Sequence, residues 1–338
     1  MKHLLIVTLV LSFFQFKSQN KKDFEVGPFD IKINRLSENT INEINAVPNK
    51  EKLEVAISPS CSQQDFVAIC KLSWITKLKI GSVTSKTLIL TDVKSVSELK
   101  NLQRFSIFST VKTPIDASIF SKLVNLESLY IINNQLNNPK KLSSLTKVRT
   151  ISFTNTGIKT IDFIEKMPDL ETLSIIGSNN AITSFTSLGA VKALKILELD
   201  ESKTVNQENL KALLKTSSLE EISLNNCKNI QSLDFLQNHT ELEVVSASES
   251  GLININGLTN AKKLRKLNID ETNVTSLDAL KAKENLKVLS IGKLTIVDVS
   301  PLLSCSSLSE LTVSPSIAEG QQKELKAKLS ELEISEYE

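Results

Sequence analysis

Apolar residues return along the chain in one short pattern. The clearest copy is Leu126-x-x-Leu129-x-Ile131, and the same arrangement recurs before and after it. The last apolar residue of each copy is Ile57, Ile80, Ile107, Ile131, Phe153, Ile175, Leu199, Leu224, Ala247, Ile269, Ile291 and Val313. Successive members of this series lie 22 to 27 residues apart. Chance does not keep such a register over twelve copies, so the chain is built from repeats.

Each copy predicts one short β-strand with one buried face, because successive side chains of a strand point to opposite sides. A strand this short buries its apolar face only by stacking on its neighbours. Further apolar residues, such as Leu136 and Ile158, follow the strands and lead back to the next copy. We therefore expect each copy to form one coil of a solenoid.

The repeat resembles that of the leucine-rich repeat superfamily, whose consensus LxxLxLxx[N/C]xL is matched from Leu126 to Leu136 with Asn134 at the polar position. The period of about 22 residues and the string Asp298-Val-Ser-Pro301-Leu302 are similar to the bacterial internalin type. The resemblance covers roughly residues 50 to 315. It implies an α/β solenoid, a leucine-rich repeat horseshoe of about 11–12 coils. Its parallel β-sheet would lie on the concave face, with short helical or irregular segments on the convex face.

The polar position of the repeat is often not asparagine. Its other occupants are Thr110, Thr156, Ser178, Ser202, Cys227, Ser250 and Thr272. We expect the hydrogen bonds along this row to depend on hydroxyl groups in many coils.

The chain divides into four segments. Residues 1–19 read as a signal peptide, residues 20–52 as an N-terminal cap without repeat register, residues 53–315 as the leucine-rich repeats and residues 316–338 as a C-terminal helical cap. In the last segment an amphipathic helix is expected, because apolar residues recur at helical spacings. These residues are Ile317, Leu325, Leu329 and Leu332.

The first segment indicates export. Lys2 and His3 precede an apolar run from Leu4 to Phe16, which is too short to span a bilayer, and cleavage is expected near Gln19. No cysteine directly follows the run, and no second run of about 18 apolar residues exists, so we expect no stable membrane anchor. The expected location is the periplasm, the cell surface or the medium.

Composition excludes several functions. The formal net charge is +2, from 40 basic and 38 acidic residues, which argues against nucleic-acid binding. Two histidines leave little material for acid–base or metal chemistry, and no phosphate-binding glycine motif occurs. We therefore expect no catalytic residues, no metal site and no cofactor.

The cysteines fall into two groups. Cys227 and Cys305 stand at repeat positions that face the core. Cys61 and Cys70 lie off the repeat register, nine residues apart, and predict either a disulfide or two free thiols. His239 lies on a return path between strands, where we expect a solvated or capping residue and not a catalyst.

The outward side chains of the expected concave sheet carry the candidate binding residues. Towards the N-terminus the apolar side chains Phe108, Tyr130, Ile132 and Ile176, hereafter the anchor cluster, stand beside Lys77, Lys79 and Arg104. Towards the C-terminus acidic side chains gather on adjacent strands. The acidic row is defined as Asp200, Glu201, Glu249, Asp270 and Glu271. It suggests a basic partner or a cation, or else a solvated face that keeps the protein soluble.

The favoured hypothesis is an exported, non-enzymatic module that binds a protein partner on its concave face, with a monomeric chain. The anchor cluster would supply the main contacts and the acidic row would steer a basic partner. One alternative is a hydrolase with a shallow site on the acidic sheet. Another is a surface or matrix component without a single partner.

Overall fold

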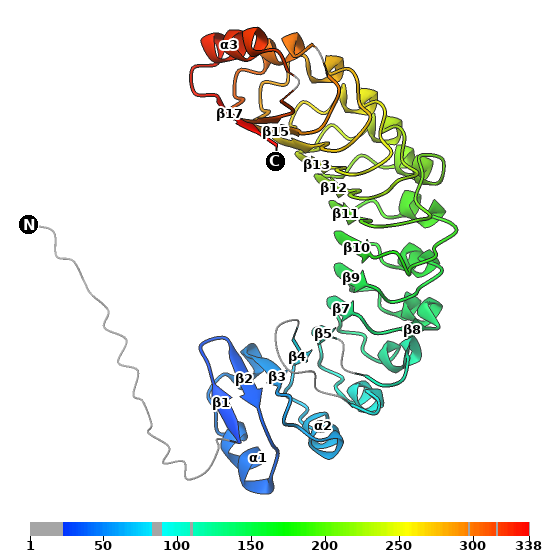
Figure 1. Ribbon diagram of the computed structural model, residues 1–338. Coiled ribbons are helices and arrows are strands. Elements are labelled where there is room, and N and C mark those ends of the chain that lie inside the picture. The colour runs from blue at the N-terminus through cyan, green and yellow to red at the C-terminus, as the bar shows by residue number, and fades with distance from the viewer. Residues whose placement is uncertain (1–22, 83–89, 109–110, 297, 316, 338) are drawn as a thin grey trace, which may run out of the picture.

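The computed structural model describes residues 23–82, 90–108, 111–296, 298–315 and 317–337. Within these residues the chain winds into a horseshoe whose inner wall is a β-sheet and whose outer wall carries short helices (Figure 1). The expected signal peptide, residues 1–19, lies outside the described residues, as does Thr110.

The inner wall of the described chain is one sheet of 15 strands. Its strands are β1 (Phe24–Val26), β2 (Asp30–Ile33), β3 (Glu54–Ile57), β4 (Lys77–Ile80), β5 (Arg104–Phe108), β7 (Ser128–Ile132), β9 (Thr150–Thr154), β10 (Thr172–Ile176), β11 (Ile196–Glu198), β12 (Glu221–Ser223), β13 (Val244–Ser246), β14 (Lys266–Asn268), β15 (Val288–Ile291), β16 (Glu310–Val313) and β17 (Glu333–Glu336). All neighbouring pairs are parallel except the β1–β2 hairpin. The predicted leucine-rich repeat horseshoe, with its parallel concave sheet, is confirmed.

The outer wall is built from short elements. Three α-helices, α1 (Glu38–Asn45), α2 (Gln63–Ile69) and α3 (Glu319–Lys328), lie towards the two ends of the described chain. The other connectors form 3₁₀ helices and a small second sheet of β6 (Ile115–Asp116) and β8 (Leu136–Asn137). The 3₁₀ helices are Lys50–Lys52, Lys94–Glu98, Ala117–Phe120, Pro139–Ser144, Asp162–Lys166, Thr186–Ala190, Asn209–Lys215, Asp234–Leu236, Asn256–Leu258, Asp278–Leu280 and Ser300–Ser304.

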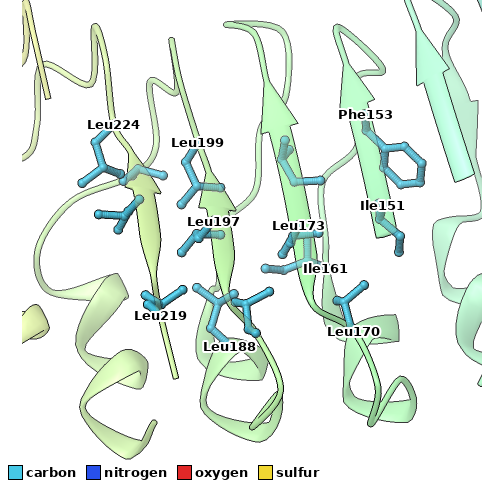
Figure 2. Packing of buried hydrophobic residues seen from close by; sticks show 14 of the residues in the cluster. Ile151, Phe153, Ile161, Leu170, Leu173, Leu188, Leu197, Leu199, Leu219 and Leu224 are labelled. Atoms are coloured by element: carbon cyan, nitrogen blue, oxygen red, sulfur yellow. The ribbon is translucent and has the colours of Figure 1, made fainter. Parts of the chain in front are cut away.

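The core lies between the two walls and follows the repeat. Parallel pairing places Ile151 beside Leu173 and Leu173 beside Leu197, and each of these side chains is buried. Figure 2 shows these leucines and isoleucines stacked from coil to coil, with Leu188 reaching in from the connector. One strand face is thus buried from β2 to β16, which is why the two-residue alternation in the sequence predicts the inward side correctly.

Both ends contain more repeat structure than we expected. Within the predicted N-terminal cap, β2 pairs in parallel with β3 and places Ile31 beside Val55. Within the predicted helical cap, α3 is present and buries Leu325, but β17 follows it and pairs in parallel with β16. The sequence hides these two coils because each lacks the leucine pattern of the others.

One insertion shifts the polar row. Ser178 was expected at the polar position of its coil, but its side chain is exposed. Asn180 is buried there instead and donates from Nδ2 to the Ile176 carbonyl at 2.8 Å. Hydroxyls replace asparagine in other coils, as expected, since Ser250 and Thr272 donate to carbonyl oxygens three residues earlier, at 2.6 and 2.7 Å.

Candidate functional site

The anchor cluster lies on three strands of the concave sheet, β5, β7 and β10, with β9 between the last two. Phe108 on β5 pairs directly with Ile132 on β7, and Tyr130 stands two residues before Ile132 on the same face. Thr154 on β9 separates Ile132 from Ile176 on β10. Since parallel strands are about 4.8 Å apart, the cluster spans roughly 14 Å across the sheet. All four anchor side chains are partly exposed. Phe108, Tyr130 and Ile132 form one apolar strip on the inner wall, and Ile176 stands beyond Thr154.

Positive charge borders this strip on the N-terminal side. The Lys79 ammonium on β4 lies 5.6 Å from the centre of the Phe108 ring, within the range of a cation–π contact. Lys77 on the same strand pairs with Arg104 on β5. Lys79 therefore stands against the anchor cluster, whereas Lys77 and Arg104 lie at the opposite end of their strands from Phe108.

The acidic row divides into two kinds of side chain. Asp200 accepts hydrogen bonds from the Ser223 hydroxyl at 2.7 Å and from the Asn225 backbone N–H at 2.8 Å, both in the next coil. Asp270, three coils further on, does the same and accepts from the Ser290 hydroxyl at 2.7 Å and from the Gly292 N–H. These two carboxylates therefore join coils and are only partly available to a partner.

A similar link between coils occurs at Asn225, which lies between the two aspartates in the sequence. Asn225 accepts from the Ser246 hydroxyl at 2.7 Å and from the Ser248 N–H at 2.9 Å, which is the same arrangement with an amide oxygen. Asp270 is 6% exposed, and burial raises the pKa of its carboxyl group despite its hydrogen bonds. Burial is therefore the larger influence on this carboxyl, and the neighbouring Glu271 charge acts in the same direction.

The glutamates of the row stand one residue further along each coil and face outwards. Glu201, Glu249 and Glu271 have φ angles of 61°, 54° and 55°, in the left-handed region that glutamate seldom adopts. Glu271 accepts from Lys293 at 2.9 Å and from the Tyr337 hydroxyl at 3.0 Å, and these hydrogen bonds lower the pKa of its carboxyl group. Glu201 and Glu249 have no such side-chain partners among the described residues and are the exposed acids of the row.

The cysteines do not form the disulfide that we considered. Cys61 and Cys70 are both free and buried. They stand at opposite ends of α2, whose seven residues extend over roughly 10 Å, beyond the reach of a disulfide. The Cys61 thiol donates to the Ile33 carbonyl at 3.1 Å, and burial raises its pKa to about 12. Both are core thiols that pack the N-terminal coils.

His239 is fully buried, so of the two expected roles, solvated or capping, the solvated one is wrong. Its Nδ1 accepts from the Leu219 backbone N–H at 3.3 Å, and its Nε2 lies 3.1 Å from the Leu213 carbonyl. Both ring nitrogens are thus engaged by the backbone if Nε2 carries the proton. Burial lowers the pKa of the imidazole, which favours this neutral form. The ring bridges coils and has no access to a substrate.

Neither a metal-binding cluster nor a membrane-crossing helix occurs among the described residues. No group of three or more histidine, cysteine, aspartate or glutamate side chains is arranged to hold a metal ion there. Within the same residues, no helix has the length and apolar character needed to cross a bilayer.

Comparison with known proteins supports the repeat and the fold. A family profile described as leucine-rich repeats in two copies matches residues 146–190. An internalin (InlF) from Listeria monocytogenes superposes with a TM-score of 0.68 at 18% identity, covering 86% of this chain and 82% of the internalin. A second structure, the functional domain of the same organism's InlJ, gives a TM-score of 0.55 at 16% identity, with 82% and 62% of the chains covered.

A plant structure also matches. The leucine-rich-repeat ectodomain of a receptor kinase from Arabidopsis thaliana, solved with CASPARIAN STRIP INTEGRITY FACTOR 2, has a TM-score of 0.52 at 15% identity and covers 85% of this chain and 39% of that one. Comparison with curated protein sequences gives no match. The repeat pattern, the stacked parallel strands and these structures agree: the chain folds as a leucine-rich repeat solenoid, similar in architecture to the internalins.

Proposed function

We propose that this chain is an exported, non-enzymatic module that holds a protein partner on its concave face. The observation that carries the proposal is the anchor cluster, where Phe108, Tyr130 and Ile132 form a partly exposed apolar strip on adjacent strands. Aromatic and large aliphatic side chains dominate the binding energy of protein interfaces when they are desolvated together. Ser152 and Thr154 on the neighbouring strand β9 are partly exposed and supply hydroxyl groups at the rim of the strip.

Three further points support the proposal. The Arabidopsis ectodomain of similar fold was solved in complex with a factor, and this supports a binding role for the same architecture here. The apolar segment from Leu4 to Phe16 favours export to the periplasm, the cell surface or the medium. The acids Glu201 and Glu249 would steer a basic region of the partner towards the C-terminal half of the face.

The alternative of a hydrolase lacks a supporting observation. Asp200 and Asp270 are engaged by the coil that follows each of them, and His239 is buried among backbone groups. A structural surface component remains the competing hypothesis, because it needs the same fold but no anchor cluster.

A capture experiment separates the two hypotheses. The mature chain, residues 20–338, is immobilised beside a variant that carries Phe108→Ala, Tyr130→Ala and Ile132→Ala, and extracts of the source cells and of their surroundings are passed over both. A binding module retains a partner only on the unaltered protein. Equal retention on both proteins contradicts the assignment of the anchor cluster.

A matched control removes exposed apolar groups elsewhere. Val124 and Ile253 lie on connectors and are 53% and 50% exposed. Val124→Ala with Ile253→Ala should leave capture unchanged, because these side chains lie outside the concave strip. Thermal unfolding of each variant checks that the solenoid is intact.

A further inference from the structure

A second surface lies at the N-terminal end of the same sheet. A hollow of about 550 Å³ opens between the tip of the β1–β2 hairpin and the first residues of β3, β4 and β5. Its wall includes Phe29 from the hairpin, Lys52 and Glu54 around the start of β3, Lys77 from β4 and Arg104 from β5. None of these residues belongs to the anchor cluster.

Phe29 is held in place with its ring in solvent. Its backbone carbonyl accepts from the Glu54 N–H at 3.1 Å, which fixes the hairpin tip to the neighbouring strand. Its side chain is nevertheless 82% exposed, and Val26 on the same hairpin is 50% exposed. A fixed aromatic ring in solvent is ready to bury apolar area on a ligand without further loss of backbone freedom.

The charges of the hollow are predominantly positive. Lys52, Lys77 and Arg104 face a single carboxylate, that of Glu54. The Lys77 ammonium donates to the Lys52 carbonyl at 3.0 Å, so its charge is positioned but not neutralised there. Glu54 and Lys77 form no ion pair with each other within the described chain. The ion pairs of the described chain all lie elsewhere on the solenoid.

Arg104 differs from the arginines further along the sheet. Arg149 pairs with Glu171 of the next coil, and Arg265 pairs with Glu243 of the preceding coil at 2.9 Å. Arg104 has no carboxylate partner within the described residues, and its side chain is exposed. Its guanidinium is therefore free to accept a planar carboxylate in a two-pronged contact.

We propose that this hollow binds an acidic segment of a protein, in which an apolar side chain packs on Phe29 while a carboxylate meets Arg104 and Lys77. The proposal extends the proposed function, because it gives the partner a chemistry at this end of the concave face. A nucleic-acid phosphate is the disfavoured occupant, because the same face carries the exposed acids Glu201 and Glu249, which would repel a long polyanion.

The test uses defined peptides and the full mature chain. The probe is a fluorescein-labelled ten-residue peptide of alternating glutamate and leucine, and binding is followed by fluorescence anisotropy at low salt. Two comparison peptides replace every leucine by serine or every glutamate by lysine. A single-stranded DNA oligonucleotide of ten bases represents the phosphate alternative.

The proposal predicts that the glutamate–leucine peptide binds best and that added salt weakens it. Arg104→Glu should weaken the affinity by about tenfold or more, and Phe29→Ser by about fivefold. The matched control is Lys266→Glu, which reverses an exposed charge at the same strand position on β14 and should change the affinity by less than about twofold.

Three outcomes would overturn the proposal: equal losses for Arg104→Glu and Lys266→Glu, stronger binding of the lysine peptide or the oligonucleotide, or no saturable binding of the glutamate–leucine peptide. A further variant, Tyr130→Ala, separates this proposal from the proposed function. If Tyr130→Ala leaves peptide affinity unchanged, the hollow binds the peptide independently of the anchor cluster. This conclusion holds whatever the capture experiment shows for the anchor cluster.

Discussion

The two halves of the concave face use one strand position for opposite purposes. In the N-terminal half the residue after the last core position is Phe108, Ile132 or Ile176, and its side chain remains partly exposed. In the C-terminal half the same position holds Asp200 or Asp270, and the carboxylate bonds to the next coil. The backbone places both sets alike, so the chemistry of the side chain decides whether the position serves a partner or the solenoid.

This contrast teaches how a repeat sheet can acquire a binding surface. A carboxylate or amide at this position finds a hydroxyl and a backbone N–H one coil away and uses them, which holds neighbouring coils together. An apolar side chain finds no such group and stays available for an interface. Affinity and stability should therefore respond to different residues of one face.

The largest expected effect is on affinity in the N-terminal half. Tyr130→Ala should weaken binding of the captured partner by about 2 kcal/mol, or roughly 30-fold in Kd, because it removes a central aromatic anchor. The free energy of unfolding should stay within about 0.5 kcal/mol, since the ring is outside the core. Calorimetric titration and urea unfolding measure the two quantities. A loss of stability as large as the loss of affinity would mean that Tyr130 is structural.

The next effect is on stability in the C-terminal half. Asp270→Ala should lower the free energy of unfolding by about 2 kcal/mol, because Gly292 N–H and the Ser290 hydroxyl lose their acceptor at a buried site. Glu201→Ala is the control and should cost less than about 0.5 kcal/mol, because its side chain is exposed. Urea unfolding measures both variants. Equal losses in free energy of unfolding would contradict the division of the acidic row into carboxylates that join coils and carboxylates that face solvent.

A smaller effect comes from the left-handed glutamates. Glu249→Gly should raise the free energy of unfolding by about 0.5 kcal/mol, because glycine adopts the φ of 54° without strain but costs more entropy to order. Glu221→Gly, within strand β12, is the matched control and should be destabilising. Thermal melts that show destabilisation by both changes would contradict the expected relief of strain at Glu249.

The smallest effect is a pH dependence at Asp270. The pKa of the Asp270 carboxyl group is raised in the folded chain, so folding favours its protonated form. Its contribution to stability, compared with that of an uncharged amide, is therefore complete below the unfolded pKa of 3.8. This contribution is lost as the pH rises through the folded pKa. Asp270→Asn should therefore gain stability relative to the unaltered protein between acidic and neutral pH. Unfolding curves at several pH values give the difference in free energy of unfolding between Asp270→Asn and the unaltered protein. A difference that does not change with pH, or that changes in the opposite direction, would contradict the expected effect.

The fold followed from the sequence because the core repeats. Alternating apolar residues such as Leu129 and Ile131 identify both the strand and its buried side, and the constant period defines the stacking. The terminal coils escaped prediction for two reasons. Strand β2 carries the alternation without the leading leucine, and β17 has one apolar residue, Ile334, where the repeat has two. Asn180 escaped because an insertion displaced it from the expected position.

The site was only partly readable in the sequence. Strand alternation correctly grouped Phe108, Tyr130 and Ile132 on one face, since that grouping depends only on register. The internal use of Asp200 was missed, although Ser223 and Asn225 in the next coil are a signal that such a bridge can form. The free state of Cys61 depends on a helix between the cysteines, which spacing alone does not reveal.

The most direct test of this account is side-chain footprinting of the complex with the captured partner. Hydroxyl radicals oxidise exposed aromatic and aliphatic side chains, and mass spectrometry reads the modification of each residue with and without partner. We expect strong protection of Phe108, Tyr130 and Ile132 and unchanged oxidation of the connector residues Val124 and Ile253. Unchanged oxidation of Phe108 and Tyr130 in a saturated complex would contradict the claim that the anchor cluster is the binding surface.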